Sequence, residues 1–123
     1  MIEIRKGQLS DVEHIVELQL QMAQETEGLK LDKKTVTKGV QGVFQQPARG
    51  AYWVAEENGK CLAVFLAIPE WSDWRNATVM WIHSLYVIPQ ARKKGVFSKM
   101  FRNLKQQVEQ STELAGLRLY VDK

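Results

Sequence analysis

The chain has 123 residues, of which 45% are hydrophobic and 25% are charged, as expected for one globular domain with one hydrophobic core. No apolar run approaches the roughly 20 residues that cross a membrane, and residues 1–8 lack the apolar segment of a secretory signal. The single cysteine, Cys61, cannot form an internal disulfide, and no Cys/His cluster suggests a metal site. These features predict a cytoplasmic protein without a metal and without a membrane partner.

The formal net charge is +3, a mild excess of positive charge. It suits a polyanionic ligand such as a nucleotide or a coenzyme as well as it suits nucleic acid. Basic residues at 92–94 and 99–105 are scattered, and acidic side chains elsewhere dilute their field. We therefore expect no nucleic-acid partner.

The first half of the chain predicts one strand and two helices. Residues 2–5 alternate as in a short strand, and Ser10 with Glu13 has the spacing of a capping box at a helix start. This helix should end at Gly28. A second helix should begin at Asp32 and stop before Pro47. Its apolar residues fall on one face: Val36, Val40, Val43 and Phe44.

The middle of the chain predicts a hairpin followed by a long strand. Residues 51–56 read as a strand, and Asn58-Gly59 is a dipeptide favoured in two-residue type I′ turns. Residues 61–68 form an apolar run that suits a strand buried on both faces. Residues 69–76 read as a polar and aromatic connection, and residues 77–88 as the longest strand.

The last part predicts a turn, a third helix and a fifth strand. Pro89 ends the long strand, and the helix after it has one apolar face formed by Phe97, Met100, Phe101, Leu104 and Val108. Residues 117–121 read as a strand. The predicted order is β-α-α-β-β-β-α-β, an α/β arrangement with a mixed sheet. Because a helix separates the last two strands, they should be parallel.

The strongest local signal is a strand followed by Pro89, three basic residues, Gly95 and a helix. A helix N-terminus exposes unpaired N–H groups and the positive end of the helix dipole, which together favour phosphate. Gly95 has no Cβ and would let a diphosphate come close to the main chain. The alternative is a basic surface turn that only contacts solvent.

Residues 85–97 resemble motif A of the GNAT acetyltransferases. In that motif a strand ends in hydrophobic-Val-x-Pro, and Q/R-x-x-G-x-G/A and a helix follow. Arg92 matches the Q/R position and Gly95 the first glycine, whereas Phe97 stands where most members have Gly or Ala. The element order and residues 71–76 also resemble a bacterial GNAT subgroup, so the resemblance spans the chain, as a single domain over residues 1–123.

The resemblance implies that acetyl-CoA is the cosubstrate. Its pantetheine arm would pair with the main chain of three strand residues: Leu85, Tyr86 and Val87. Its diphosphate would lie against the turn and the first helical residues: Arg92, Lys93, Lys94, Gly95, Val96 and Phe97. A primary amine of a small molecule or peptide would approach near residues 25–35 and 69–76, and would take the acetyl group by direct transfer.

Three residues are candidates for the proton transfers. His83 lies on the long strand, and an imidazole has an ordinary pKa suited to a base. In strict alternation it would share a face with Trp81 and Leu85; the alternative is a core histidine. Glu70 could act through a water, or be an ordinary loop charge. Tyr120 should border the thioester, or be a packed aromatic residue.

GNAT domains continue with a further helix and strands, whereas this sequence ends at Lys123. We therefore expect a domain truncated after its fifth strand, with weak acetyl transfer. We also expect a homo-oligomer formed through the exposed sheet edge. The alternative function is a catalytically impaired module that binds acetyl-CoA or serves assembly.

Overall fold

The computed structural model of the chain describes residues 1–110 and 114–119, and it confirms the predicted order of elements. The strands are β1 (Glu3–Lys6), β2 (Ala51–Glu57), β3 (Lys60–Ser72), β4 (Ala77–Val87) and β5 (Leu114–Leu119). The helices are α1 (Val12–Glu27), α2 (Lys33–Gln45) and α3 (Val96–Gln110). Short 3₁₀ turns are η1 (Leu9–Asp11), η2 (Pro47–Arg49) and η3 (Pro89–Ala91).

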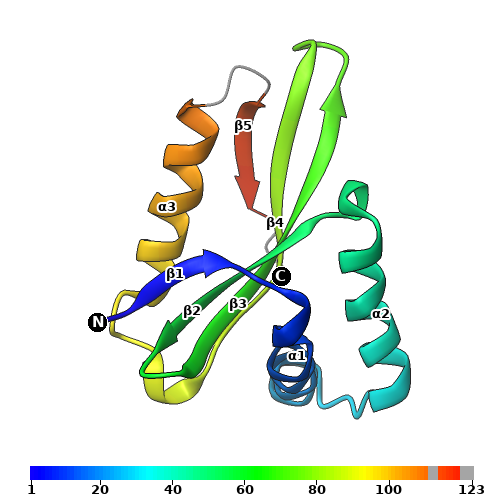
Figure 1. Cartoon of the computed structure of the whole chain (residues 1–123), viewed down its shortest axis with the longest axis vertical. Coiled ribbons are helices and arrows are strands. Elements are labelled where there is room, and N and C mark those ends of the chain that lie inside the picture. Colours follow the sequence, from blue (N-terminus) through cyan, green and yellow to red (C-terminus); the bar gives the residue numbers. More distant parts are fainter. Residues whose placement is uncertain (111–113, 120–123) are drawn as a thin grey trace.

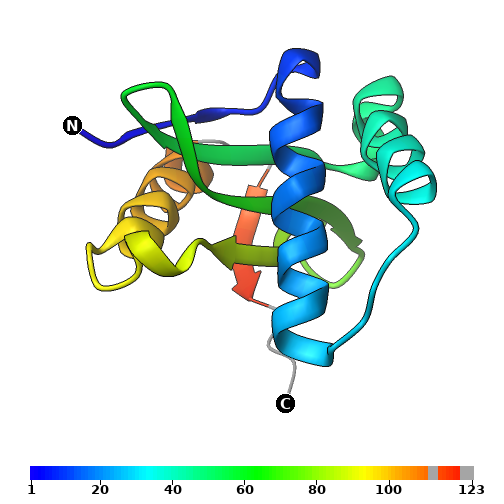
Figure 2. The ribbon, with the colours of Figure 1, turned by 90° about the horizontal axis from the view of Figure 1, so that it is seen from below.

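The five strands form one sheet in the order β1-β2-β3-β4-β5. Neighbours from β1 to β4 are antiparallel, and β5 is parallel to β4, as the intervening helix predicted. Helices α1 and α2 cover one face of the sheet and α3 covers the other (Figures 1 and 2). Within the described residues β5 is an edge strand, so oligomerisation through this edge stays a prediction.

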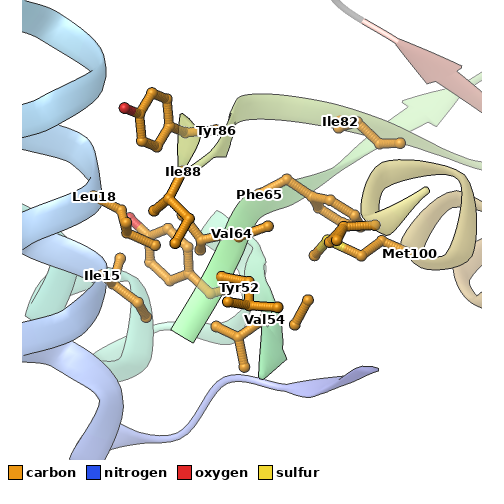
Figure 3. Close-up of a cluster of buried hydrophobic side chains, with 14 of the residues drawn as sticks. Ile15, Leu18, Tyr52, Val54, Val64, Phe65, Ile82, Tyr86, Ile88 and Met100 are labelled. Carbon is orange, nitrogen blue, oxygen red and sulfur yellow. The ribbon is translucent and has the colours of Figure 1, made fainter. Parts of the chain in front are cut away.

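The core has two halves, one on each face of the sheet (Figure 3). Val64 points toward the α1 side, whereas Phe65 lies beside Met100 of α3, and all three side chains are fully buried. Strand β3 is therefore buried on both faces, as its apolar run predicted. None of the helices in residues 1–110 combines the length and apolarity that a bilayer crossing requires.

The predicted start of α1 is wrong. Residues 9–11 form a 3₁₀ turn, so the helix begins one residue after Asp11 rather than at Ser10. The Asp11 carboxylate accepts a hydrogen bond from the main-chain N–H of Gln8, with an N–O distance of 2.7 Å. It also accepts one from each terminal nitrogen of Arg5, with N–O distances of 2.8 Å. Arg5 also donates to Glu56 on β2 at 2.9 Å. This ion-pair cluster ties β1, β2 and the start of α1 together, and Asp11 forms a capping box with Gln8 at the start of η1.

Two other boundaries differ from the sequence analysis. Strand β3 runs to Ser72, so residues 69–72 belong to a long hairpin rather than to a connection. The hairpin extends away from the helices (Figure 1), so its polar residues do not interrupt a buried face. Strand β5 begins at Leu114 rather than at residue 117 and includes Gly116, which pairs with Val79 of β4.

Other boundary signals are confirmed. Gly28, with φ of 64°, ends α1 in the left-handed conformation that a C-cap glycine adopts. The Asp32 carboxylate accepts the N–H of Thr35 at the start of α2. Asn58 and Gly59 have φ values of 53° and 80°, as a type I′ hairpin requires.

Replacing Asp11 by Asn should destabilise the protein by about 1–2 kcal/mol at pH 7, because a carboxylate only 7% exposed loses its charge-assisted bonds to Arg5. Arg5 holds the pKa of the Asp11 carboxyl below its usual range. The stabilisation is therefore present above the ordinary carboxyl pKa and is lost as pH falls. Urea unfolding from pH 7 to pH 3 should show the difference from wild type shrinking.

The exposed Glu109 on α3 is the control, and Glu109→Gln should change stability by less than about 0.5 kcal/mol. A difference between Asp11→Asn and wild type that stays constant down to pH 3 would contradict this account of the cluster.

Candidate functional site

Strand β4 is paired differently on its two edges. Its β3 side is paired along nearly the whole strand, from Ala77 to Val87. On the other side, β5 pairs only from Thr78 to Ile82, and Leu119 at the described end of β5 lies opposite Ile82. The β4 edge from residue 84 to residue 87 is paired with no strand residue among 1–110 and 114–119. It offers main-chain N–H and C=O groups to an extended ligand.

An extra residue in β4 changes its register at the start of this open edge. Leu66 pairs with His83 and Val64 pairs with Tyr86, so two β4 residues lie opposite one β3 residue. This is a β-bulge, and Ser84 within it has a positive φ of 52°. A bulge bends its strand and changes where the following side chains point.

The bulge changes which later residue of β4 shares the face of His83. Paired residues of neighbouring strands share a face, and Val64 and Leu66 are two positions apart. His83 and Tyr86 therefore lie on the same face, and strict alternation through Leu85 is wrong. This is the face that α1 and α2 cover, and Figure 3 shows the Tyr86 side chain directed toward α1.

The turn after β4 has the geometry predicted for an anion site. Lys93 and Gly95 both have left-handed φ values, 75° and 72°, and α3 begins at Val96. No atom lies within 4 Å of the position that a Cβ on Gly95 would take. Within residues 1–110, no side chain accepts a hydrogen bond from the amides of residues 95–98. These donors are available to a diphosphate, so the turn fits such a group.

The remaining cofactor candidates surround this turn. Lys93 and Lys94 are exposed, whereas Val96 is buried in the core. The Phe97 ring lies against the ring of Phe101, with centroids 5.9 Å apart, one turn further along α3. The bulky residue at the second glycine position therefore contacts a neighbour on its own helix.

Arg92 binds a residue that the sequence analysis did not single out. Its guanidinium forms a two-pronged ion pair with Glu25, near the end of α1, with N–O distances of 2.6 and 2.8 Å. Its Nε donates to the carbonyl of Val87 at 3.0 Å. The guanidinium carbon lies 5.5 Å from the centre of the Tyr86 ring, and the Tyr86 hydroxyl donates to Glu25 at 2.7 Å.

This cluster stabilises a charged carboxylate. The Arg92 guanidinium, with help from the Tyr86 hydroxyl, lowers the pKa of Glu25 to about 2. Partial burial, followed by the hydrogen bond to Glu25, raises the pKa of Tyr86. Glu25 and Arg92 are 67 positions apart, so no local pattern predicted their contact. The one signal was that Glu25 begins the segment expected to face the acceptor.

A cavity of about 730 Å³ lies beside the cluster. Its walls come from the second half of α1, the connection to α2, the end of β4 and the turn η3. Leu20, Leu29 and Leu31 give it an apolar surface, and Glu25 and Tyr86 contribute polar groups. The predicted acceptor segment 25–35 thus lines a cavity. Residues 70–75 line a separate hollow of about 240 Å³ at the hairpin tip.

The predicted catalytic residues are not all close together. His83 is half-buried, with its ring centre 6.3 Å from that of Trp81. Glu70 is exposed on the same face and pairs with Val79, four residues along β4 and so about 13 Å from His83. Tyr120 lies outside the described residues. Within the described part of the chain, no group of three or more His, Cys, Asp or Glu side chains could hold a metal ion.

The bulge generates a prediction about stability. Ser84→Gly should retain or slightly raise stability, because glycine adopts a positive φ without strain. Ser84→Val should destabilise the protein by about 1–3 kcal/mol, because a β-branched residue resists this conformation. Thr78→Val, where β4 pairs with β3 without a bulge, should cost less than about 0.5 kcal/mol. Urea denaturation measures all three, and a Ser84→Val variant as stable as wild type would rule out the bulge.

The chain is similar to known proteins in both sequence and structure. The model of the acetyltransferase (GNAT) family matches residues 12–123. A possible acetyltransferase from Clostridium difficile 630 is 37% identical, with a TM-score of 0.91; the match covers 100% of this chain and 81% of that one. No curated protein matches.

More distant structures share the fold. A predicted acetyltransferase from Clostridium acetobutylicum, solved with acetyl-CoA, is 19% identical with a TM-score of 0.78, covering 100% of this chain and 82% of that one. A ribosomal-protein-alanine N-acetyltransferase from Brucella melitensis biovar Abortus 2308 is 15% identical with a TM-score of 0.83, again covering 100% and 82%. The family model spans nearly the whole sequence, and the chain therefore belongs to the acetyltransferase (GNAT) family.

Proposed function

We propose that this chain is an acetyl-CoA-dependent N-acetyltransferase that moves an acetyl group directly to a primary amine of a small molecule or peptide. Family membership supports acyl transfer from acetyl-CoA. The observation that carries the proposal is the open edge of β4, which leads into a turn with available amides. An extended arm with a diphosphate at its end matches both features.

The protein would hold the cofactor through main-chain groups of β4 and of the turn that follows it. Leu85, Tyr86 and Val87 would pair with the pantetheine arm as an added strand does. The amides after Gly95 would bind the diphosphate, and the exposed Lys93 and Lys94 would add positive charge. The cofactor supplies an acetyl group activated as a thioester.

The same strand would stabilise the charge that develops during transfer. A β4 amide near Tyr86 or Val87 would donate to the thioester carbonyl oxygen as negative charge grows there. An ammonium group must lose a proton before it can attack. We assign this step to His83, which shares a face with Tyr86, and we keep Glu70 as a residue that acts through water. Tyr120 is proposed to border the thioester.

Replacement of Gly95 by Glu should weaken coenzyme A binding more than tenfold in calorimetry. The new carboxylate would occupy the space above the turn and repel the diphosphate. Gly59→Glu is a matched control, because Gly59 also has a positive φ, of 80°, and open space around a Cβ. This control should bind coenzyme A within about twofold of wild type. Equal affinity of the two variants would contradict the assignment of the turn.

Replacement of His83 by Gln should lower kcat by about a hundredfold and leave the KM for acetyl-CoA nearly unchanged, because a base acts in the chemical step. Release of the coenzyme A thiol, measured with a panel of primary amines, reports the rate. Thr78→Val on the same strand is the control. Undiminished kcat in the His83 variant would remove this residue from the mechanism. Binding of acetyl-CoA without thiol release by the wild type would favour a non-catalytic binding module.

A further inference from the structure

The ion pair between Glu25 and Arg92 joins the two halves of the proposed site. Arg92 opens the turn proposed to hold the diphosphate, three residues before Gly95. Glu25 lines the 730 Å³ cavity, whose wall includes part of the segment predicted to face the acceptor. A change in the position of the Arg92 side chain would therefore affect both halves.

Glu25 and Tyr86 together form a binding site for a cation. The carboxylate supplies negative charge and the Tyr86 ring supplies an aromatic face. The guanidinium of Arg92 occupies this site in the structure. The protein thus fills its own cation site with a side chain from the neighbouring turn.

The Arg92–Glu25 pair is also easy to separate. The side chains of the two residues are 43% and 40% exposed, and ion pairs at such exposure contribute little net stability. A diphosphate at the turn offers Arg92 more negative charge than one carboxylate, with the same two-pronged geometry. The two N–H groups that face Glu25, on Nη1 and Nη2, cannot face the diphosphate at the same time.

We propose that Glu25 and the cofactor diphosphate compete for Arg92, so that cofactor binding releases the Glu25 carboxylate into the cavity, where it binds the positive charge of the acceptor amine. The proposal rests on the proposed function and adds to it a coupling between cofactor and acceptor. In the free protein Arg92 fills the cation site. With the diphosphate in place, Arg92 turns to the phosphates and the site becomes available.

The competition also implies reciprocal coupling between the two ligands. If the diphosphate draws Arg92 away, an acceptor cation that takes its place also strengthens cofactor binding. Tyr86 would then act as a positioning residue, since its hydroxyl orients the Glu25 carboxylate at 2.7 Å. The acceptor class that this site selects is an amine that is positively charged when it arrives.

Calorimetry with coenzyme A itself tests the competition, in wild type, Glu25→Gln, Arg92→Gln and the double variant. Glu25→Gln removes the competitor and should bind coenzyme A about threefold to fivefold more tightly than wild type. The gain should vanish in the Arg92→Gln background, because the effect acts through Arg92. Glu17→Gln, on the same helix and paired with Lys33, is the control and should change affinity less than about 1.5-fold.

Pantetheine, which lacks the diphosphate, gives the second arm of the calorimetry, and its affinity should be the same in wild type and Glu25→Gln. An NMR spectrum of the Arg92 Nε–H group gives the third arm. This signal should move when coenzyme A is added to wild type. Its chemical shift in the complex should match that of the same group in the Glu25→Gln variant bound to coenzyme A.

Three results would overturn the competition while leaving the proposed function intact. They are weaker or unchanged coenzyme A binding in Glu25→Gln, a gain that persists without Arg92, or an Arg92 signal that coenzyme A does not move. Weaker or unchanged binding in Glu25→Gln would mean that Glu25 only stabilises the position of Arg92 at the turn. If coenzyme A bound none of the proteins, the proposed function itself would fail, and the competition with it.

Discussion

The structure depends on the pairing of β4, whose β3 edge is paired along almost its whole length and whose other edge has a described strand partner only as far as Ile82. Its pairing with β3 runs from Ala77 to Val87 and fixes it in the sheet. Its pairing with β5 stops at Ile82 in the described residues. The bulge at Ser84 lies where the open part begins, and it places His83 and Tyr86 on the same face. The shared face of His83 and Tyr86 thus arises from one extra residue.

Electrostatic contacts connect the sheet to α1 at two places. Arg5 joins β1 to β2 and α1 through Glu56 and Asp11, which is a structural role. Arg92 joins the turn before α3 to the end of α1 through Glu25, at the edge of a cavity. The two clusters use the same chemistry. The first is the more buried, and the second is exposed enough to rearrange.

Much of the fold could be predicted from the sequence, because apolar periodicity and turn residues report local structure. The two-sided burial of β3, the Asn58-Gly59 turn and the parallel β4–β5 pair follow from such signals. The bulge could not be predicted, because Ser84 is an ordinary serine in sequence and only the register with β3 reveals it. Glu25 was missed because its partners lie more than 60 positions away. The motif predicted the turn as a diphosphate site, and the strand pairing identifies the β4 residues whose second edge has no partner among the described residues.

The most direct measurement is a crystal structure of this chain with coenzyme A. The account predicts the diphosphate within hydrogen-bonding distance of the amides that follow Gly95, and the pantetheine arm along β4 from residue 85 to residue 87. A complex in which the turn holds no phosphate, or in which the arm avoids this edge of β4, would contradict it.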